Sequence, residues 1–107
     1  MRPAQGATTR EKHVNATDQV IKQYREQISD TDRKIVDALN QRIKLVEKLK
    51  EYKASQGIGF LDPAQEDWVL TFLSRSNHGP LSDDGLRTIY KVILEVVKGE
   101  VGERTQP

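Results

Sequence analysis

The sequence contains no cysteine, and this absence excludes several classes of protein at once. Disulfide-bonded scaffolds, thiolate metal sites and enzymes with a cysteine nucleophile are all ruled out. Only two histidines are present, His13 and His78, and both lie in segments that are typical of a tail or a loop. The N-terminus has no apolar core like that of a secretory signal, and no later run is apolar enough to span a membrane. We therefore expect a cytoplasmic protein without a metal site.

An excess of charge of one sign is also missing. The 107 residues carry 17 Lys and Arg against 16 Asp and Glu, which gives a formal net charge of +1. This balance gives no reason to expect binding to nucleic acid or to a membrane. Hydrophobic residues make up only 36% of the chain and aromatic residues 6%, so a monomer would bury a small core. The composition favours a single domain whose core a second chain completes.

A long helix is predicted from about Thr17 to Ser55. No Gly or Pro interrupts this range, and Gly57 follows it. At ~1.5 Å per residue the helix would be roughly 54 Å long, against a radius of gyration of ~13 Å for a compact domain of this size. Its own chain cannot cover such a rod, so we expect a second copy to cover it. The apolar positions that recur at helical spacing are Ile21, Tyr24, Ile28, Ile35, Leu39, Val46, Leu49 and Tyr52.

Two shorter helices follow. Asp62 is a preferred N-cap and Pro63 is favoured at the first helical position, which predicts a helix start there. Ser82 is a second N-cap, and the acidic residues after it suit the first turn of a helix that Gly99 ends. No segment shows the alternation of a strand. The predicted fold is all-α, an intertwined homodimeric bundle of one long and two shorter helices per chain.

The predicted organisation has three parts. Residues 1–16 are polar and are expected to form a disordered arm. Residues 17–99 carry all three helical patterns and form the domain, and residues 100–107 are expected to be a flexible tail.

Cations occupy positions of the long helix where apolar side chains are expected. At ~100° per residue, Arg25, Arg42 and Lys53 all fall within roughly 60° of the direction of Ile28. A buried cation without an anion is costly. Pairing with Asp32 would neutralise only one of them, and long side chains can also reach out to solvent. A small polyanionic ligand would satisfy the rest, so the stripe indicates an anion-binding site inside the bundle.

Two carboxylates lie one turn apart at the start of the second helix. Asp62 can serve as the N-cap and Glu66 as an acid that the helix dipole favours. Both roles are compatible with ligand binding on the same face.

The arrangement of these residues resembles the all-helical class of chorismate mutases. That class shows Arg-x-x-Ile-x-x-x-Asp-x-x-Ile, then Leu-x-x-Arg, a Lys eleven residues later, and Asp-Pro-x-Arg-Glu. The matching segments here are REQISDTDRKI, LNQR, Lys53 and DPAQE, and GPLSDDGLRTIYKVILEV resembles the third helix. The resemblance covers about Val20 to Val97.

The resemblance implies a reaction and a site. The family converts chorismate to prephenate by a [3,3] rearrangement within one molecule, in aromatic amino acid biosynthesis, and needs no cofactor. The enzyme holds a reactive conformation and stabilises charge on the breaking ether oxygen. Arg42 and Lys53 of one subunit, with Arg25 of the partner's long helix, are expected to bind the carboxylates. Lys53 would also reach the ether oxygen, and Glu66 with Asp62 would hold the substituent on ring carbon four.

The chain departs from the family pattern at three expected substrate-binding positions. Gln65 stands where familiar members carry Arg, and Val97 and Val101 fall where they carry Ser and Gln. A shift of one residue would bring Glu100 to the last of these positions.

Because Gln65 stands where an Arg is expected, the sequence is compatible with more than one substrate. In 4-amino-4-deoxychorismate an ammonium replaces the ring hydroxyl, so the ligand charge falls from about −2 to about −1. Gln65 would not repel that ammonium as an Arg would, and the resulting product serves the synthesis of p-aminophenylalanine-derived natural products, antibiotics among them. Two further alternatives are an isochorismate pyruvate-lyase, which shares the Arg and Lys positions, and a non-catalytic helical interaction module.

Overall fold

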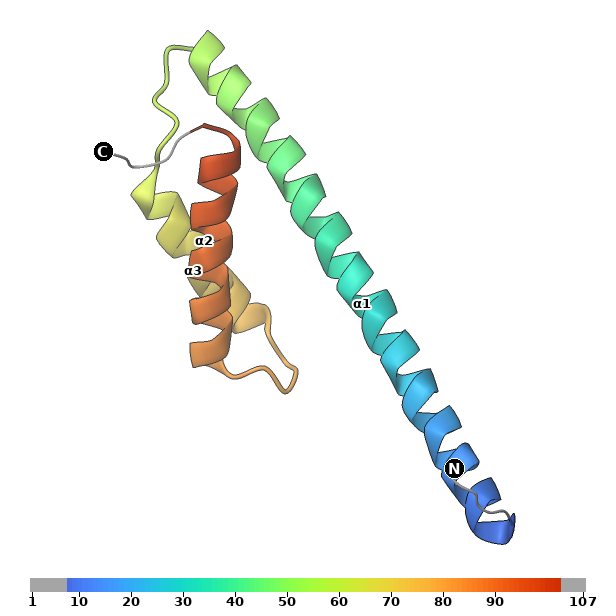
Figure 1. The fold of residues 1–107 in the computed structure, drawn as a ribbon. Helices are drawn as coiled ribbons and strands as arrows, with labels where there is room; N and C mark the ends of the chain where they lie inside the picture. Colours follow the sequence, from blue (N-terminus) through green and yellow to red (C-terminus); the bar gives the residue numbers. More distant parts are fainter. Residues whose placement is uncertain (1–7, 103–107) are drawn as a thin grey trace. The chain divides into compact units, whose positions relative to one another are not determined.

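The computed structural model describes residues 8–102, with side chains from residue 18 onward. Three α-helices follow one another along the chain: α1 (Thr8–Ser55), α2 (Pro63–Ser76) and α3 (Asp83–Glu100) (Figure 1). Between residues 8 and 102 there is no strand, which confirms the predicted all-α fold. The first seven residues of the predicted arm and the last five of the predicted tail lie outside the described residues.

Helix α1 begins at Thr8, earlier than the start near Thr17 that the apolar pattern predicts. The polar segment before Thr17 contains neither Gly nor Pro from Thr8 onward, so its backbone has no residue that stops a helix. The apolar positions therefore mark the part of α1 that another helix can cover, whereas the helical backbone itself begins nearer the N-terminus.

Gly57 ends α1 as the sequence predicts. Its φ of +70° lies in the left-handed region that favours glycine. The Ile58 N–H donates to the Lys53 carbonyl at 2.8 Å, and the Gly57 N–H donates to the Ala54 carbonyl at 3.2 Å. These two bonds form a Schellman motif, which satisfies carbonyls that the helix leaves unpaired.

The caps of the two shorter helices are those that the sequence predicts. The Gln65 N–H donates to the Asp62 carboxylate at 3.2 Å, and Pro63 is the first residue of α2. The Gly85 N–H donates to the Ser82 hydroxyl at 3.0 Å at the start of α3. Because these signals are local, they fix the helix starts independently of packing.

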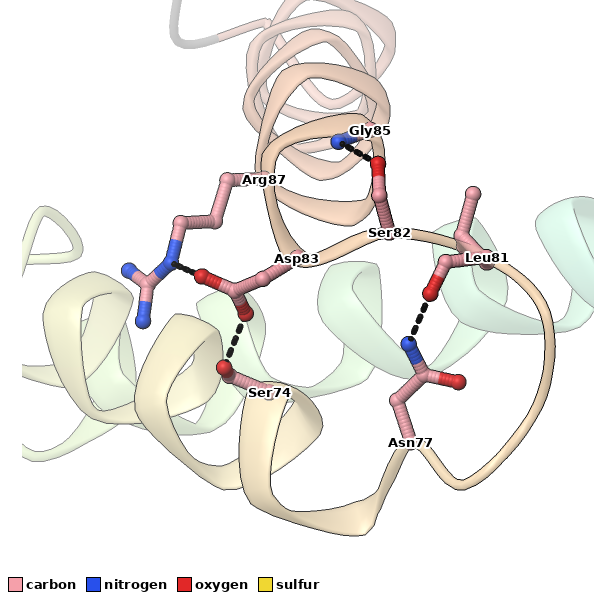
Figure 2. Close-up of polar contacts among 7 residues, drawn as sticks. All are labelled: Ser74, Asn77, Leu81, Ser82, Asp83, Gly85 and Arg87. Carbon is pink, nitrogen blue, oxygen red and sulfur yellow. Dashed lines mark hydrogen bonds and ion pairs between the residues drawn. The ribbon is translucent and has the colours of Figure 1, made fainter.

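Polar contacts join the end of α2 to the start of α3 (Figure 2). The Asn77 side-chain amide donates to the Leu81 carbonyl at 2.8 Å. The Asp83 carboxylate accepts from the Ser74 hydroxyl and from Arg87 Nε, the latter at 2.8 Å. Both hydrogen bonds lower the pKa of Asp83, and the one from Ser74 has the larger effect. These bonds fix the turn between α2 and α3, which pack against each other.

The chain divides into two compact units, Met1–Ala38 and Leu39–Pro107. In the first unit the structure describes only α1, and its large apolar side chains are exposed, among them Ile28 at 59% and Ile35 at 52%. The second unit contains the rest of α1 together with α2 and α3. Among its described residues, Leu70, Val97 and Val101 are buried.

The second unit also exposes large apolar side chains on every helix. The Trp68 and Phe72 rings of α2 are stacked with their centroids 5.0 Å apart, yet the two residues are 56% and 50% exposed. An exposed apolar surface of this extent is uncommon on a monomeric protein. The others are Leu45, Leu49, Tyr52, Ile58, Leu61, Leu81, Ile89, Val92 and Val96.

Candidate active site

A cavity of about 180 Å³ lies in the second unit, among α1, α2 and α3. It brings together five of the residues that the sequence analysis assigns to the site: Arg42, Lys53, Asp62, Gln65 and Glu66. Apolar side chains and one further cation complete its lining: Val46, Leu49, Phe60, Leu61, Val69, Leu94 and Lys98. Charged groups in a mostly apolar wall interact more strongly than they would in water.

Arg42 projects from α1 and is half-buried. Its guanidinium carbon lies 5.7 Å from the centroid of the Tyr90 ring of α3. No carboxylate in the part of the chain whose side chains are described lies within ion-pair distance of Arg42. The aromatic ring holds the cation in place without neutralising it, so its charge is available to an anionic ligand.

Lys53 lies three turns further along α1, in its last turn. Its ammonium donates to the Phe60 carbonyl at 3.0 Å and lies 5.8 Å from the centroid of the Phe60 ring. The chain returns past Lys53 here because the turn at Gly57 reverses its direction. An ammonium has three donors and the carbonyl takes one of them. The side chain is thus oriented by the backbone while it keeps its positive charge.

Helix α2 contributes the carboxylates. Asp62 is exposed at the rim and caps the helix, and Glu66 lies one turn later with 34% of its side chain exposed. The Glu66 Oε2 lies 3.1 Å from the Lys98 Nζ of α3. Gln65, which lies between these two acids in the sequence, is exposed and also lines the cavity.

Lys98 is a cavity residue that the sequence analysis missed. Its side chain is only 19% exposed, and its ammonium also lies 3.4 Å from Glu95 Oε2. The hydrogen bond to Glu66 raises the pKa of Lys98, although partial burial acts in the opposite direction. One signal was present in the sequence: Tyr90, Leu94 and Lys98 recur every four residues, and all three face the α1 cations or the cavity.

Three other predicted positions lie at the C-terminal end of α3 and do not line this cavity. Val97 and Val101 are buried at 3% and 8% exposure, and neither lines the cavity. Glu100 is exposed and does not line the cavity either. The face of α3 that lines the cavity carries Leu94 and Lys98, one residue further along than the predicted Val97.

Arg25 lies in the first unit, where it is exposed, and it is not among the residues that line the cavity. Its predicted place in a partner's site stays a prediction. Among the described residues, no group of three or more acidic or histidine side chains could hold a metal ion. No described helix combines the length and the hydropathy needed to cross a bilayer.

Comparison with known proteins identifies the class of protein. The chain has the all-helical fold of a family of isomerases: the family model of chorismate mutase type II matches residues 24–100. The chain belongs to this family and is an enzyme of the chorismate mutase type. The solved structure of chorismate mutase (form II) from Thermus thermophilus is similar, with a TM-score of 0.73 and 26% sequence identity. The alignment covers 80% of this chain and 98% of that one. No curated protein sequence gives a significant match.

Proposed function

We propose that the enzyme rearranges chorismate to prephenate. The observation that carries this proposal is the meeting of Arg42 and Lys53 with Glu66 in one partly apolar cavity. Among the described residues, Arg42 and Lys53 form no ion pair, so the two cations suit a dicarboxylate. Glu66 suits the hydroxyl on ring carbon four as an acceptor.

The rearrangement requires a correctly oriented substrate and cations that stabilise the charge that develops on it. It requires no group that donates or accepts a proton. The substrate must fold so that its side chain lies over its ring, and anchoring its carboxylates restricts it to such conformers. Arg42 is assigned to one carboxylate. Lys53 is assigned to the ether oxygen, where negative charge grows as the carbon–oxygen bond breaks. The apolar part of the lining lowers the local dielectric and strengthens both interactions.

A direct test separates the enzyme classes. Purified protein is incubated separately with chorismate, isochorismate and 4-amino-4-deoxychorismate, and the products are resolved by chromatography. The proposal expects prephenate from chorismate and no pyruvate from isochorismate. Pyruvate release would identify a lyase, and the absence of turnover on all three would leave the interaction module.

The proposed active form is a homodimer in which each chain supplies Arg25 to the partner's cavity. Exposed apolar residues on both units support this assembly, because burying each large side chain stabilises a complex by about 1.5–3 kcal/mol. The first unit, of which the structure describes only the α1 residues, also carries Arg25.

Mixing two inactive variants tests the shared site. Arg25→Ala and Arg42→Ala are each expected to be inactive as homodimers. In a heterodimer of the two, one site carries both substitutions and the other carries none. Refolding an equal mixture should therefore restore about a quarter of wild-type activity, because half of the dimers are mixed and each has one intact site. Light scattering should report dimer mass at micromolar concentration. A stable folded monomer, or no recovery of activity in mixed dimers, contradicts the assembly.

A second candidate substrate, 4-amino-4-deoxychorismate, is favoured by Gln65, which lines the cavity without a charge. Gln65→Arg tests whether this position reads ring carbon four. At ~4–6 Å and an effective dielectric near ~20, a guanidinium and an ammonium repel by about 3–4 kcal/mol before relaxation and screening. We expect kcat/KM on the amino analogue to fall at least ~10-fold, which is about 1.4 kcal/mol. On chorismate it should stay unchanged or rise.

The matched control is Gln56→Arg, which adds the same charge at an exposed residue that does not line the cavity. It should change neither kcat/KM. Equal effects of Gln65→Arg on both substrates would mean that position 65 does not contact the substituent on ring carbon four.

A further inference from the structure

We infer that Lys98 is a specificity-determining residue: it supplies the cation that is missing at Gln65 and, through Glu66, selects a substrate with a neutral hydroxyl on ring carbon four over one with an ammonium there. This inference rests on the proposed function and adds a residue to the proposed site.

The geometry links the two positions. Lys98 approaches the cavity from α3, and Gln65 approaches the same cavity from α2. Glu66, the residue after Gln65, is 3.1 Å from the Lys98 ammonium. Both side chains of this pair are partly buried, at 19% and 34% exposure. The pair is therefore less screened by solvent than an ion pair on the surface.

The charge of the cavity follows from its residues. Among the residues that line each chain's cavity, Arg42, Lys53 and Lys98 against Asp62 and Glu66 leave one net positive charge. Glu95, which also lies 3.4 Å from Lys98, is outside this lining and 60% exposed. The Arg25 proposed to come from the partner brings the total to two. That total balances chorismate, whose two carboxylates carry about −2. Without Lys98 the total would be one, which balances the amino analogue at about −1.

The ion pair also acts locally on the substituent. Glu66 can accept a hydrogen bond from a ring hydroxyl while Lys98 donates to the same carboxylate. An ammonium in place of that hydroxyl would put a second cation on one carboxylate, a few ångströms from Lys98. Like charges at that distance repel, and Glu66 is already neutralised by its partner. The hydroxyl-bearing substrate is therefore preferred.

The experiment measures kcat/KM for chorismate and for 4-amino-4-deoxychorismate in the wild type and in Lys98→Met, Lys98→Gln and Lys98→Arg. Both neutral variants should lower kcat/KM for chorismate at least ~10-fold and leave that for the amino analogue unchanged or raised. The ratio of the two should therefore fall at least ~10-fold. Lys98→Arg keeps the charge and should keep the ratio. The matched control is Lys91→Met on the same helix, at an exposed residue outside the cavity lining, and it should change neither value.

The preference ratio separates specificity from a structural role, because loss of folded enzyme lowers both rates alike. An unchanged ratio in the neutral variants overturns the inference. So does failure of both neutral variants to fold, monitored by circular dichroism, when Lys98→Arg folds. A wild type that prefers the amino analogue overturns it as well and supports the second candidate substrate. A wild type that rearranges neither compound contradicts the proposed function itself. A wild type that rearranges chorismate, with an unchanged ratio in the neutral variants, contradicts only the inference about Lys98.

Discussion

Replacing Arg42 with alanine is expected to reduce kcat/KM for chorismate at least ~100-fold, the scale of losing one preorganised electrostatic contact. The guanidinium is held over the Tyr90 ring and has no carboxylate partner among the described residues. Its charge is therefore not taken up by a structural ion pair. KM should rise because the substrate carboxylate is bound in the ground state as well as in the transition state, and kcat should fall because the anchored carboxylate restricts the substrate to its reactive conformer. Steady-state kinetics on purified protein, with circular dichroism to confirm folding, give the answer.

The matched control for this change is Arg33→Ala. Arg33 pairs with Asp30 at 3.2 Å on the same helix, and its side chain is 71% exposed. Exposed ion pairs of this kind contribute little, so activity should stay within about twofold of wild type. Near-normal activity in folded Arg42→Ala would mean that the cavity is not the site of reaction.

Local signals explain the parts of the fold that the sequence predicted well. Asp62 and Ser82 cap their helices with their own side chains, and Gly57 ends α1 because it can adopt a positive φ. Each of these features depends on about four to six neighbouring residues. They can therefore be recognised before any packing is known. The start of α1 was harder, because the polar residues before Thr17 neither favour burial nor stop a helix.

The cavity was predictable in part. Arg42 and Lys53 were assigned from the face of one helix, where ~100° per residue fixes their relative direction. The turn after α1 brings these two residues into one cavity with Asp62, Gln65 and Glu66. The sequence indicates this arrangement only through the resemblance to a known family.

Which residues of α3 line the cavity depends on how this helix is rotated about its own axis relative to the helices around it. The sequence of one helix does not determine that rotation. A difference of one residue turns a side chain by ~100°. That difference separates the buried Val97 from Lys98, which lines the cavity. The proposed second chain is beyond local signals as well, although the apolar residues that remain exposed on both units are consistent with it.

Lys53→Met is expected to lower kcat by ~100- to 1,000-fold, with a smaller change in KM. Methionine keeps most of the length and apolar contact of lysine and removes its charge. If the ammonium meets the ether oxygen, its interaction is strongest when the bond is breaking, so the loss belongs mainly to the transition state. The contrast with Arg42→Ala, where KM should also rise, is itself measurable.

Two comparisons make the Lys53 result specific. Lys48→Met removes the same charge from an exposed residue of α1 that does not line the cavity, and it should leave kcat unchanged. Lys53→Met also loses the bond to the Phe60 carbonyl, which is worth about 0.5–1.5 kcal/mol of stability. Thermal melting measures that loss separately, and assays well below the melting temperature keep it out of kcat. A folded Lys53→Met variant with wild-type kcat would place the stabilisation of the ether oxygen on another group, and Lys98 is the next cation in the same cavity. The kinetics of Lys53→Met and Lys98→Met side by side therefore distinguish the two lysines: the first should change kcat for both substrates, and the second should change the preference between them.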